Sequence, residues 1–173
     1  MGNLILTEGF AALRGEVEIE LDDIARGIAS CRWPARVELL QRRPALILDA
    51  AHTVESMAAL MAALQTHFPG RGLRFVFGCS AGKNHRAMLG LMAPRCRSLI
   101  ATQADSPRAI AAPEIADAAS AAGITAVRAI ANPPEAVMTA LREAAPDEVV
   151  CVTGSFFVAG EVRHAWEQGK LLN

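Results

Sequence analysis

Hydrophobic residues follow two alternating patterns along most of this chain. Short apolar runs, which are typical of buried strands, are each followed by a segment with apolar residues at helical spacing. One such stripe comprises Val54, Met57, Ala58, Met61, Leu64 and Phe68. The predicted strands comprise residues 37–41, 46–49, 73–77, 98–101, 126–130 and 149–152. The predicted helices comprise residues 54–67, 86–93, 113–122, 133–144 and 156–168.

This alternation predicts βαβ units and therefore an α/β fold. We expect a three-layer sandwich, with a mostly parallel sheet of about six strands and helices on both faces. Residues at the helix ends agree with this prediction. The sequence from Asn132 to Glu135 resembles a capping box with proline at the first helical position, and Gly123 suits a left-handed helix cap.

The first 33 residues do not follow the alternation. Residues 6–14, and a segment that begins at Asp22 or Asp23, each predict a short helix, and these are too small to enclose a core. Proline disfavours the helical conformation in the residue before it, so Trp33-Pro34 marks a boundary. The sequence therefore predicts a main domain over residues 34–173, preceded over residues 1–33 by an arm or by the end of another domain.

The composition is that of one globular domain. Of the 173 residues, 52% are hydrophobic and 20% are charged, which excludes a disordered chain. A formal net charge of −1 gives no basic excess for nucleic acid or for an anionic membrane surface. The apolar runs are too short to span a membrane, and the first residues lack the basic segment of a secretory signal.

The cysteines are scattered along the chain without a Cys-x-x-Cys pair. They are Cys31, Cys79, Cys96 and Cys151. This spacing does not match a zinc site, and we predict no metal site in the chain. It predicts reduced thiols, mostly buried, in a cytoplasmic protein.

The turn after the predicted strand 46–49 is the first candidate site. In an open α/β sheet, ligands bind in the crevice outside the carboxyl ends of the strands. Asp49 could there accept hydrogen bonds from hydroxyl groups or orient His52, and His52 could donate to an anion or a ribose. Alternatively, Asp49 caps the following helix and His52 is a solvated turn residue. The pattern leaves both interpretations open.

Residues 78–84, with the sequence G-C-S-A-G-K-N, are the second candidate. A phosphate loop needs four residues between its glycines and a hydroxyl residue after its lysine. Here three residues separate the glycines, and Asn84 replaces the hydroxyl residue. The segment is therefore no phosphate loop, although Lys83 can still place a single positive charge in the crevice.

Two further residues lie at element ends. Ser155 follows the last predicted strand and starts a helix, where a helix cap explains it without any ligand. It lacks the pattern of a hydrolase nucleophile. Arg36 follows the Trp33-Pro34 boundary, where its planar guanidinium could bind phosphate or be a surface charge.

Five segments, in order, resemble motifs of the C-terminal domain of the Mur ligase superfamily, nearest to its bacterial folylpolyglutamate synthase/dihydrofolate synthase branch. They are residues 33–38 (W-P-A-R-V-E), 47–53 (I-L-D-A-A-H-T), 76–89 (V-F-G-C-S-A-G-K-N-H-R-A-M-L), 102–109 (T-Q-A-D-S-P-R-A) and 150–163 (V-C-V-T-G-S-F-F-V-A-G-E-V-R). The resemblance covers about residues 20–173 and implies a Rossmann-like sandwich. The ordered set is more specific than any single motif.

The resemblance also implies a reaction. In such ligases ATP phosphorylates a carboxylate, and the amine of an amino acid, glutamate in the folate branch, attacks the acyl phosphate. The central domain holds the phosphate loop and Mg²⁺, and the C-terminal domain closes over the nucleotide. Carried over to this chain, the resemblance implies that Arg36 meets the ATP phosphates, that Asp49 and His52 contact the nucleotide, and that Ser155 lies near the incoming amino acid. Lys83 is a further candidate for nucleotide binding.

The chain departs from the family motifs at several positions. Ala50 and Thr53 replace glycine and asparagine, while Gly82 and Asn84 replace two acids. The family's upstream G-T-N-G-K-G-S loop does not occur in these residues. We therefore expect a fragment that does not catalyse ligation by itself, whose folate, glutamate, ATP and Mg²⁺ are ligands of a longer parent that contains the ATPase domain.

Three hypotheses follow. The first is the C-terminal domain of an ATP-dependent folate–glutamate ligase. The second is a stand-alone, non-catalytic α/β domain that binds a nucleotide or a partner protein, which the missing loop and the replaced acids favour. The third is a Mur-type ligase domain that acts on peptidoglycan precursors, but the W-P-A-R junction and the T-G-S-F-F segment favour the folate branch.

Overall fold

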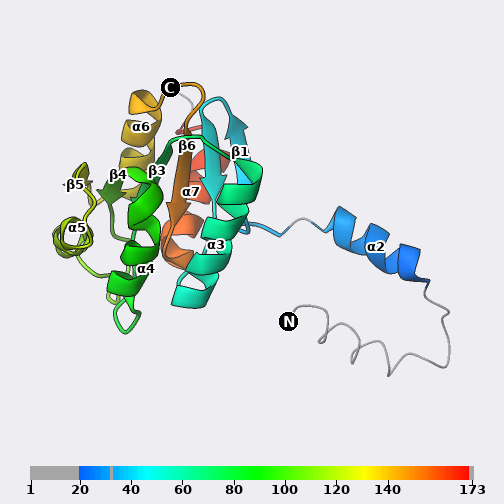
Figure 1. The fold of residues 1–173 in the computed structure, drawn as a ribbon, viewed down its shortest axis with the longest axis horizontal. Coiled ribbons are helices and arrows are strands. Elements are labelled where there is room, and N and C mark those ends of the chain that lie inside the picture. The colour runs from blue at the N-terminus through cyan, green and yellow to red at the C-terminus, as the bar shows by residue number, and fades with distance from the viewer. Residues whose placement is uncertain (1–19, 32, 172–173) are drawn as a thin grey trace. The chain divides into compact units, whose positions relative to one another are not determined.

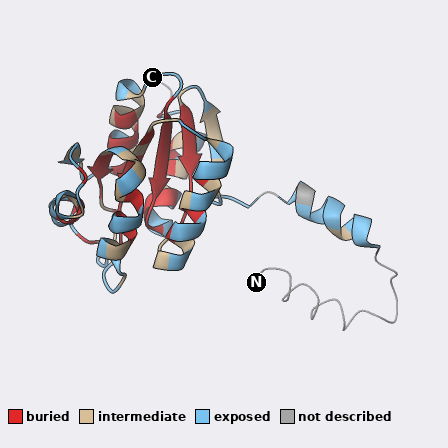
Figure 2. Ribbon diagram, viewed as in Figure 1, coloured by how far each residue is buried: buried red, intermediate tan, exposed pale blue. Residues whose placement is uncertain are grey.

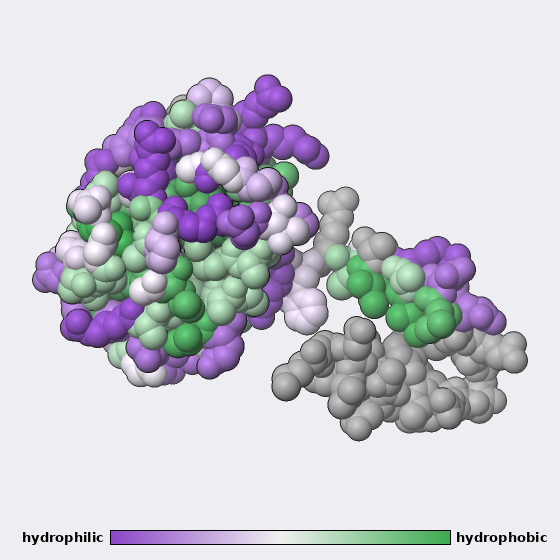
Figure 3. Space-filling view, in the orientation of Figure 1, coloured by the Kyte–Doolittle hydropathy of each residue, from purple (hydrophilic) through white to green (hydrophobic). Residues whose placement is uncertain are grey.

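The computed structural model describes residues 20–31 and 33–171, which separate into two units between Trp33 and Pro34 (Figure 1). In the first unit, α2 (Leu21–Ser30) begins before the predicted start at Asp22 or Asp23. Asp23 lies inside the first turn, where its carboxylate accepts a hydrogen bond of 3.2 Å from the Glu20 amide. Hydrophobic and hydrophilic residues gather on different sides of this helix (Figure 3). The helix predicted over residues 6–14 lies outside the described residues.

The second unit is built on one sheet of six strands. In chain order these are β1 (Glu38–Arg42), β2 (Ala45–Leu48), β3 (Leu73–Phe77), β4 (Cys96–Ala101), β5 (Val127–Ala129) and β6 (Val149–Thr153). Their spatial order is β1-β2-β6-β3-β4-β5, and only β1 runs antiparallel to its neighbour. The predicted mostly parallel sheet is confirmed. The turn that joins β1 to β2 contains a cis Arg43–Pro44 bond.

Five helices cover the two faces of the sheet. They are α3 (Val54–His67), α4 (His85–Met92), α5 (Ala112–Ala121), α6 (Pro133–Glu143) and α7 (Phe156–Glu167). Buried residues of α3, α4 and α5 pack on one face, and those of α6 and α7 pack on the other. The central strands form a buried layer between helices whose outer sides are exposed, whereas the edge strands β1 and β5 are only partly buried (Figure 2). The predicted three-layer α/β sandwich is therefore confirmed.

The apolar runs of the central strands face both cores. Along β2, Ala45 and Ile47 join the core under α3, whereas Leu46 and Leu48 join the core under α7. All four residues are buried, as expected for a parallel strand covered on both faces. Burial on both sides explains why this run is continuous rather than alternating.

The predicted helix caps are confirmed, and one strand boundary was wrong. The Asn132 side chain accepts the Glu135 amide at 2.9 Å, and Gly123 has a φ of 91°. Val37 was predicted to begin a strand, but its φ of 47° is left-handed, so β1 starts at Glu38. The other ends of the elements in this unit agree with the prediction to within two residues.

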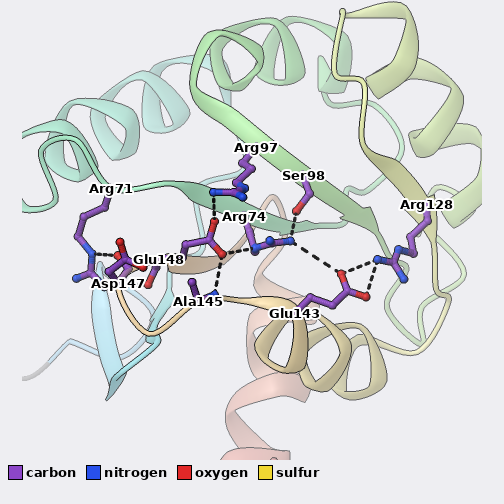
Figure 4. Close-up of polar contacts among 9 residues, drawn as sticks. All are labelled: Arg71, Arg74, Arg97, Ser98, Arg128, Glu143, Ala145, Asp147 and Glu148. Carbon is purple, nitrogen blue, oxygen red and sulfur yellow. Dashed lines mark hydrogen bonds and ion pairs between the residues drawn. The ribbon is translucent and has the colours of Figure 1, made fainter.

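A buried carboxylate occupies the amino edge of the sheet, where the parallel strands begin. Glu148 immediately precedes β6 and is 2% exposed. Its Oε2 accepts hydrogen bonds of 2.8 Å from Arg74 and from the Ala145 amide, and its Oε1 forms an ion pair at 2.9 Å with Arg97 (Figure 4). Burial by itself raises the pKa of Glu148. The hydrogen bonds and the charges of the two arginines outweigh burial and hold that pKa below its usual value.

Candidate functional site

Four polar segments meet at the carboxyl edge of the sheet. Strand pairing aligns Leu48 with Val152, and Phe77 with both Thr153 and Ala101. The segments that follow these strands therefore leave the sheet side by side. They comprise residues 49–53, 78–84, 102–109 and 153–155. This is the edge at which parallel sheets bind ligands.

Arg36 is carried into this edge by an unusual turn, which we call the Arg36 turn (residues 34–37). Both neighbours of Arg36 are left-handed without being glycine, Ala35 with a φ of 53° and Val37 with a φ of 47°. Such a conformation costs about 1–2 kcal/mol for each residue. The Ala35 amide donates to Glu38 Oε2 at 2.8 Å, and the Ala35 carbonyl accepts from the Ala50 amide at 2.9 Å.

Asp49 joins the Arg36 turn to the end of β2. Its side chain is buried, with the residue 5% exposed. Oδ2 accepts a hydrogen bond of 2.8 Å from the Val37 amide, and Oδ1 accepts one of 2.8 Å from the Ala51 amide. Asp49 does not cap α3, because Thr53 occupies that position and its hydroxyl accepts from the Ser56 amide. The contact between Asp49 and a nucleotide stays a prediction.

His52 and Arg36 meet over one aromatic ring. The centroid of the His52 ring lies 4.6 Å from that of Phe156, and the Arg36 guanidinium carbon lies 5.6 Å from the same centroid. His52 Nδ1 is 2.9 Å from the Ala50 carbonyl oxygen, which fixes the ring relative to its own turn. The structure thus brings two predicted site residues to the same exposed phenylalanine ring.

Next to this ring lies a half-open pocket of about 150 Å³. Its lining includes His52, Ser80, Lys83, Arg108, Ser155 and Phe156. In the part of the chain that the structure describes, neither Lys83 nor Arg108 forms an ion pair. Arg36 likewise forms no ion pair with any residue in the ranges 20–31 and 33–171. Cations that line a pocket without a protein counter-charge can attract an anionic ligand.

Ser155 has two roles in this arrangement. It is the N-cap of α7, and its Oγ accepts from the Phe157 amide at 3.2 Å, so the predicted cap is confirmed. It also lines the pocket, which places the amino end of a helix of 12 residues at the pocket wall. Helix amino ends favour anions because their first amide groups lack partners in the helix.

Residues 78–84 form a turn in which the departures from the family motif have local explanations. Gly82 has a left-handed φ of 81°. Asn84 is the N-cap of α4 and accepts from the Ala87 amide at 3.1 Å. The Ala81 amide donates to the Arg108 carbonyl at 2.7 Å, which joins this turn to the next one. Lys83 lines the pocket at its end.

Gly154 allows two of the site turns to pack closely. Its φ is 102°, and a Cβ at this position would lie 2.3 Å from the Gly78 carbonyl oxygen and 2.6 Å from the Phe77 ring. The Gly154 amide donates to the Ala51 carbonyl at 2.9 Å. No other residue type fits here without moving the turns.

The thiols near this edge are protonated at neutral pH. Burial raises the pKa of Cys79 to about 11 and also raises the pKa of Cys151. Among residues 20–31 and 33–171, all four cysteines are free, and Cys31 is exposed rather than buried. Within those residues no group of three His, Cys, Asp or Glu side chains could hold a metal ion.

None of the described helices is both long and apolar enough to cross a membrane.

Arg108 and Phe156 are among the pocket residues that the sequence did not predict. Arg108 lies in the motif of residues 102–109, and the motif by itself gives its arginine no role. Phe156 follows Ser155 and resembles an ordinary core residue of an amphipathic helix, yet it is 52% exposed. The exposure of Phe156 at the start of α7 could not be predicted without the strand order, because the strand order places this helix start at the pocket.

Comparison with known proteins assigns the second unit to a family. The family described as "Mur ligase, glutamate ligase domain" matches residues 35–156. A probable bifunctional folylpolyglutamate synthase/dihydropteroate synthase of Halobacterium salinarum is 33% identical over 156 residues, or 90% of this chain. A folylpolyglutamate synthase of Lacticaseibacillus casei is 29% identical over 171 residues, or 98% of this chain.

The chain spans only part of these relatives, 19% of the first and 38% of the second. Among solved structures, the folylpolyglutamate synthase of Mycobacterium tuberculosis, complexed with ADP and AMPPCP, superposes with a TM-score of 0.76 at 27% identity. That superposition covers 86% of this chain and 36% of the other.

Proposed function

This chain belongs to the family of Mur ligase glutamate ligase domains, and on that premise we propose that it is the C-terminal domain of an ATP-dependent ligase. The parent joins glutamate to a folate or pteroate carboxylate through an acyl phosphate. The observation that carries the proposal is the pocket at the carboxyl edge, where Lys83, Arg108 and the amino end of α7 converge without a protein counter-charge in the described residues.

The amino-acid part of the proposed site lies at Arg108 and Ser155. Glutamate carries two carboxylates, and a guanidinium can bind one of them through two parallel hydrogen bonds. The amino end of α7, which Ser155 caps, favours a second negative group. The pocket therefore matches an acidic amino acid better than a basic one, because a basic side chain would be repelled by Lys83 and Arg108.

The nucleotide part of the proposed site lies around Phe156. Arg36 and His52 face this ring from the Arg36 turn and from the turn after β2. Arg36 supplies a guanidinium for the phosphates, and His52 supplies a ring nitrogen for phosphate or ribose. Lys83, in the adjoining pocket, adds a charge near the phosphates. Bringing ATP and glutamate to one edge shortens the path from amine to acyl phosphate.

The phosphate loop and the Mg²⁺ ligands are assigned in this proposal to the ATPase domain of the parent. Residues 1–33 are then the end of that domain or an arm that leads from it. The match to the Lacticaseibacillus casei enzyme, which extends over 98% of this chain, supports this assignment. Mg²⁺ supplies charge neutralisation for phosphoryl transfer, and the residues described here bind and orient the other ligands. A cytoplasmic location stays a prediction.

The replaced acids no longer favour a stand-alone binding domain. Gly82 occupies a left-handed turn position, and Asn84 caps α4 as an aspartate would. Each departure thus has a local structural reason, and neither argues against a ligase. Thr53 likewise caps α3 in place of the family's asparagine.

The proposal is tested by titrating the ¹⁵N-labelled 173-residue chain with AMPPNP and with L-glutamate, because NMR shifts detect millimolar affinities. AMPPNP is expected to shift the amides of Arg36 and His52, and L-glutamate those of Ser80, Arg108 and Ser155. L-Lysine at equal concentration is the matched control and is expected to leave the pocket amides unchanged. Shifts confined to other regions, or an equal response to lysine, would contradict the proposal.

A further inference from the structure

Helix α7 carries two side chains that are linked to the Arg36 turn. Phe156 is the first residue of this helix, and its ring centroid lies 5.6 Å from the guanidinium carbon of Arg36. Arg163 follows seven residues later, which is about two turns of the helix and therefore the same face. Its Nε lies 3.4 Å from Oε2 of Glu38, the first residue of β1. Long side chains of a helix point back toward its amino end, so Arg163 is directed toward the carboxyl edge of the sheet.

Glu38 connects Arg163 to the backbone of the turn. The Oε2 atom that faces Arg163 also accepts a hydrogen bond of 2.8 Å from the Ala35 amide. Ala35 immediately precedes Arg36 and has a left-handed φ of 53°, which a residue other than glycine retains only where its surroundings fix it. A single carboxylate oxygen therefore links α7 to the residue before Arg36.

The exposure of this ion pair indicates a role other than stability. The side chains of Arg163 and Glu38 are 35% and 24% exposed, so solvent weakens their attraction and the pair adds little to stability. Arg163 also pairs with Glu167 on its own helix at 3.0 Å. The Nε atom that faces Glu38 is nevertheless buried and donates no hydrogen bond within the described part of the chain. The carboxylate of Glu38 is thus the group that compensates the charge on this side of the guanidinium.

We propose that Arg163 and Glu38 are positioning residues for the nucleotide site, which act together through the Arg36 turn. The inference rests on the proposed phosphate role of Arg36. The ion pair fixes the backbone of Ala35, while Phe156 of the same helix contacts the guanidinium itself. Two points of α7 therefore determine where the positive charge of Arg36 lies. Neither member of the pair lines the pocket beside this ring.

The first test needs no ligand. Hydrogen exchange of the Ala35 amide is compared by NMR in the wild-type chain, Glu38→Ala and Arg163→Ala. Glu38→Ala removes the acceptor and is expected to speed exchange about tenfold, whereas Arg163→Ala leaves the acceptor less fixed and is expected to speed it about threefold. The Leu99 amide, bonded to the Ala126 carbonyl at 2.9 Å, is the internal control and should not change. Unchanged exchange at Ala35 in either variant would overturn the inference, whether or not the chain binds ATP.

The second test asks whether the pair acts through Arg36. Arg163→Ala is expected to weaken AMPPNP about threefold in the wild-type chain and to add nothing in Arg36→Ala, because both changes affect one interaction. The affinity for L-glutamate should stay the same. Arg163→Lys keeps a cation opposite Glu38 and is expected to retain most of the affinity for AMPPNP. Additive losses would mean that Arg163 binds the nucleotide directly, and an equal loss of affinity for L-glutamate would mean a general change of structure. Either result would overturn the inference.

Two further variants separate positioning from the loss of any ion pair. Glu167→Gln removes the other partner of Arg163, and Arg128→Ala breaks a half-exposed pair with Glu143 at the amino edge. Both are expected to leave the affinity for AMPPNP unchanged, and a loss in either as large as that of Arg163→Ala would overturn the inference. If the wild-type chain shows no AMPPNP binding at all, the proposed function fails, whereas exchange at Ala35 still decides whether the pair holds the turn.

Discussion

The two edges of the sheet contain similar charged groups and use them differently. At the amino edge, Glu148 is surrounded by Arg74 and Arg97, and Glu143 pairs with Arg128, so opposite charges neutralise one another (Figure 4). At the carboxyl edge the cations of the pocket have no such partner among the described residues, and the buried acid binds backbone amides instead of a cation.

On the proposed function, the difference separates an edge that stabilises the fold from an edge that binds ligands. A buried acid that keeps its arginines holds strands and helices together, and removing one partner leaves an uncompensated charge. Unpaired cations add little to stability, and the two left-handed residues on either side of Arg36 have a cost. A structure retains such costs where a ligand will supply the missing counter-charge. Substitutions at the amino edge should therefore change folding, and those at the carboxyl edge should change binding, except where the backbone itself is involved.

The largest expected effect comes from a substitution at the carboxyl edge that involves the backbone itself. Gly154→Ala places a Cβ against the Gly78 carbonyl and the Phe77 ring. We expect the free energy of unfolding to fall by about 3 kcal/mol or more, because both steric overlap and left-handed strain oppose the side chain. Urea denaturation measures the loss.

Gly123→Ala is the matched control for Gly154→Ala. Its φ of 91° is similar, but a Cβ there meets nothing within 4 Å. It is expected to cost about 1 kcal/mol through backbone strain alone. Equal losses in the two variants would mean that the close packing of the site turns contributes nothing.

Glu148→Gln has the next largest expected effect. We expect the free energy of unfolding to fall by about 2–3 kcal/mol at neutral pH. The pKa of Glu148 lies below its usual value in the folded protein, so the charged carboxylate favours folding above the unfolded value of 4.5. This contribution is lost as pH falls through the folded pKa. The stability difference between the wild type and the variant should shrink in acid, and a constant difference from pH 7 to 3 would contradict the role of this charge.

The smallest expected effect has the opposite sign. Ala35→Gly relieves the left-handed strain in the Arg36 turn and is expected to raise stability by up to about 1 kcal/mol, after the extra entropy of glycine in the unfolded chain is subtracted. Ala62→Gly, on the exposed side of α3, is the control and should lose about 1 kcal/mol. A loss at both positions would show that the turn is not strained.

Most of the fold could be predicted because its signals are local. The apolar stripe of α3, the Asn132 cap and the left-handed Gly123 each depend on residues within one or two turns of the chain. The antiparallel direction of β1 could not be predicted, because a run of strand-forming residues does not specify its partner. Val37 was misplaced for a similar reason, since its conformation is set by Asp49, 12 residues away.

The candidate site was predicted less completely. A strand end beside a helix start drew attention to Asp49, His52 and Ser155, and the structure places these at one edge. Which of them is free to meet a ligand depends on burial and on contacts between distant segments. Arg108 joins the pocket only because β3 and β4 are neighbours, and Phe156 stays exposed only because its helix starts at the pocket wall.

The central claim is that the carboxyl edge holds unpaired cations for two anionic ligands, and a crossed binding experiment tests it most directly. AMPPNP and L-glutamate affinities are measured by NMR titration for Arg36→Ala and Arg108→Ala, with Arg142→Ala, an exposed arginine of α6, as the control. Arg36→Ala is expected to weaken AMPPNP about tenfold and leave glutamate unchanged, and Arg108→Ala to do the reverse. Affinities that match those of Arg142→Ala in both variants would contradict the claim.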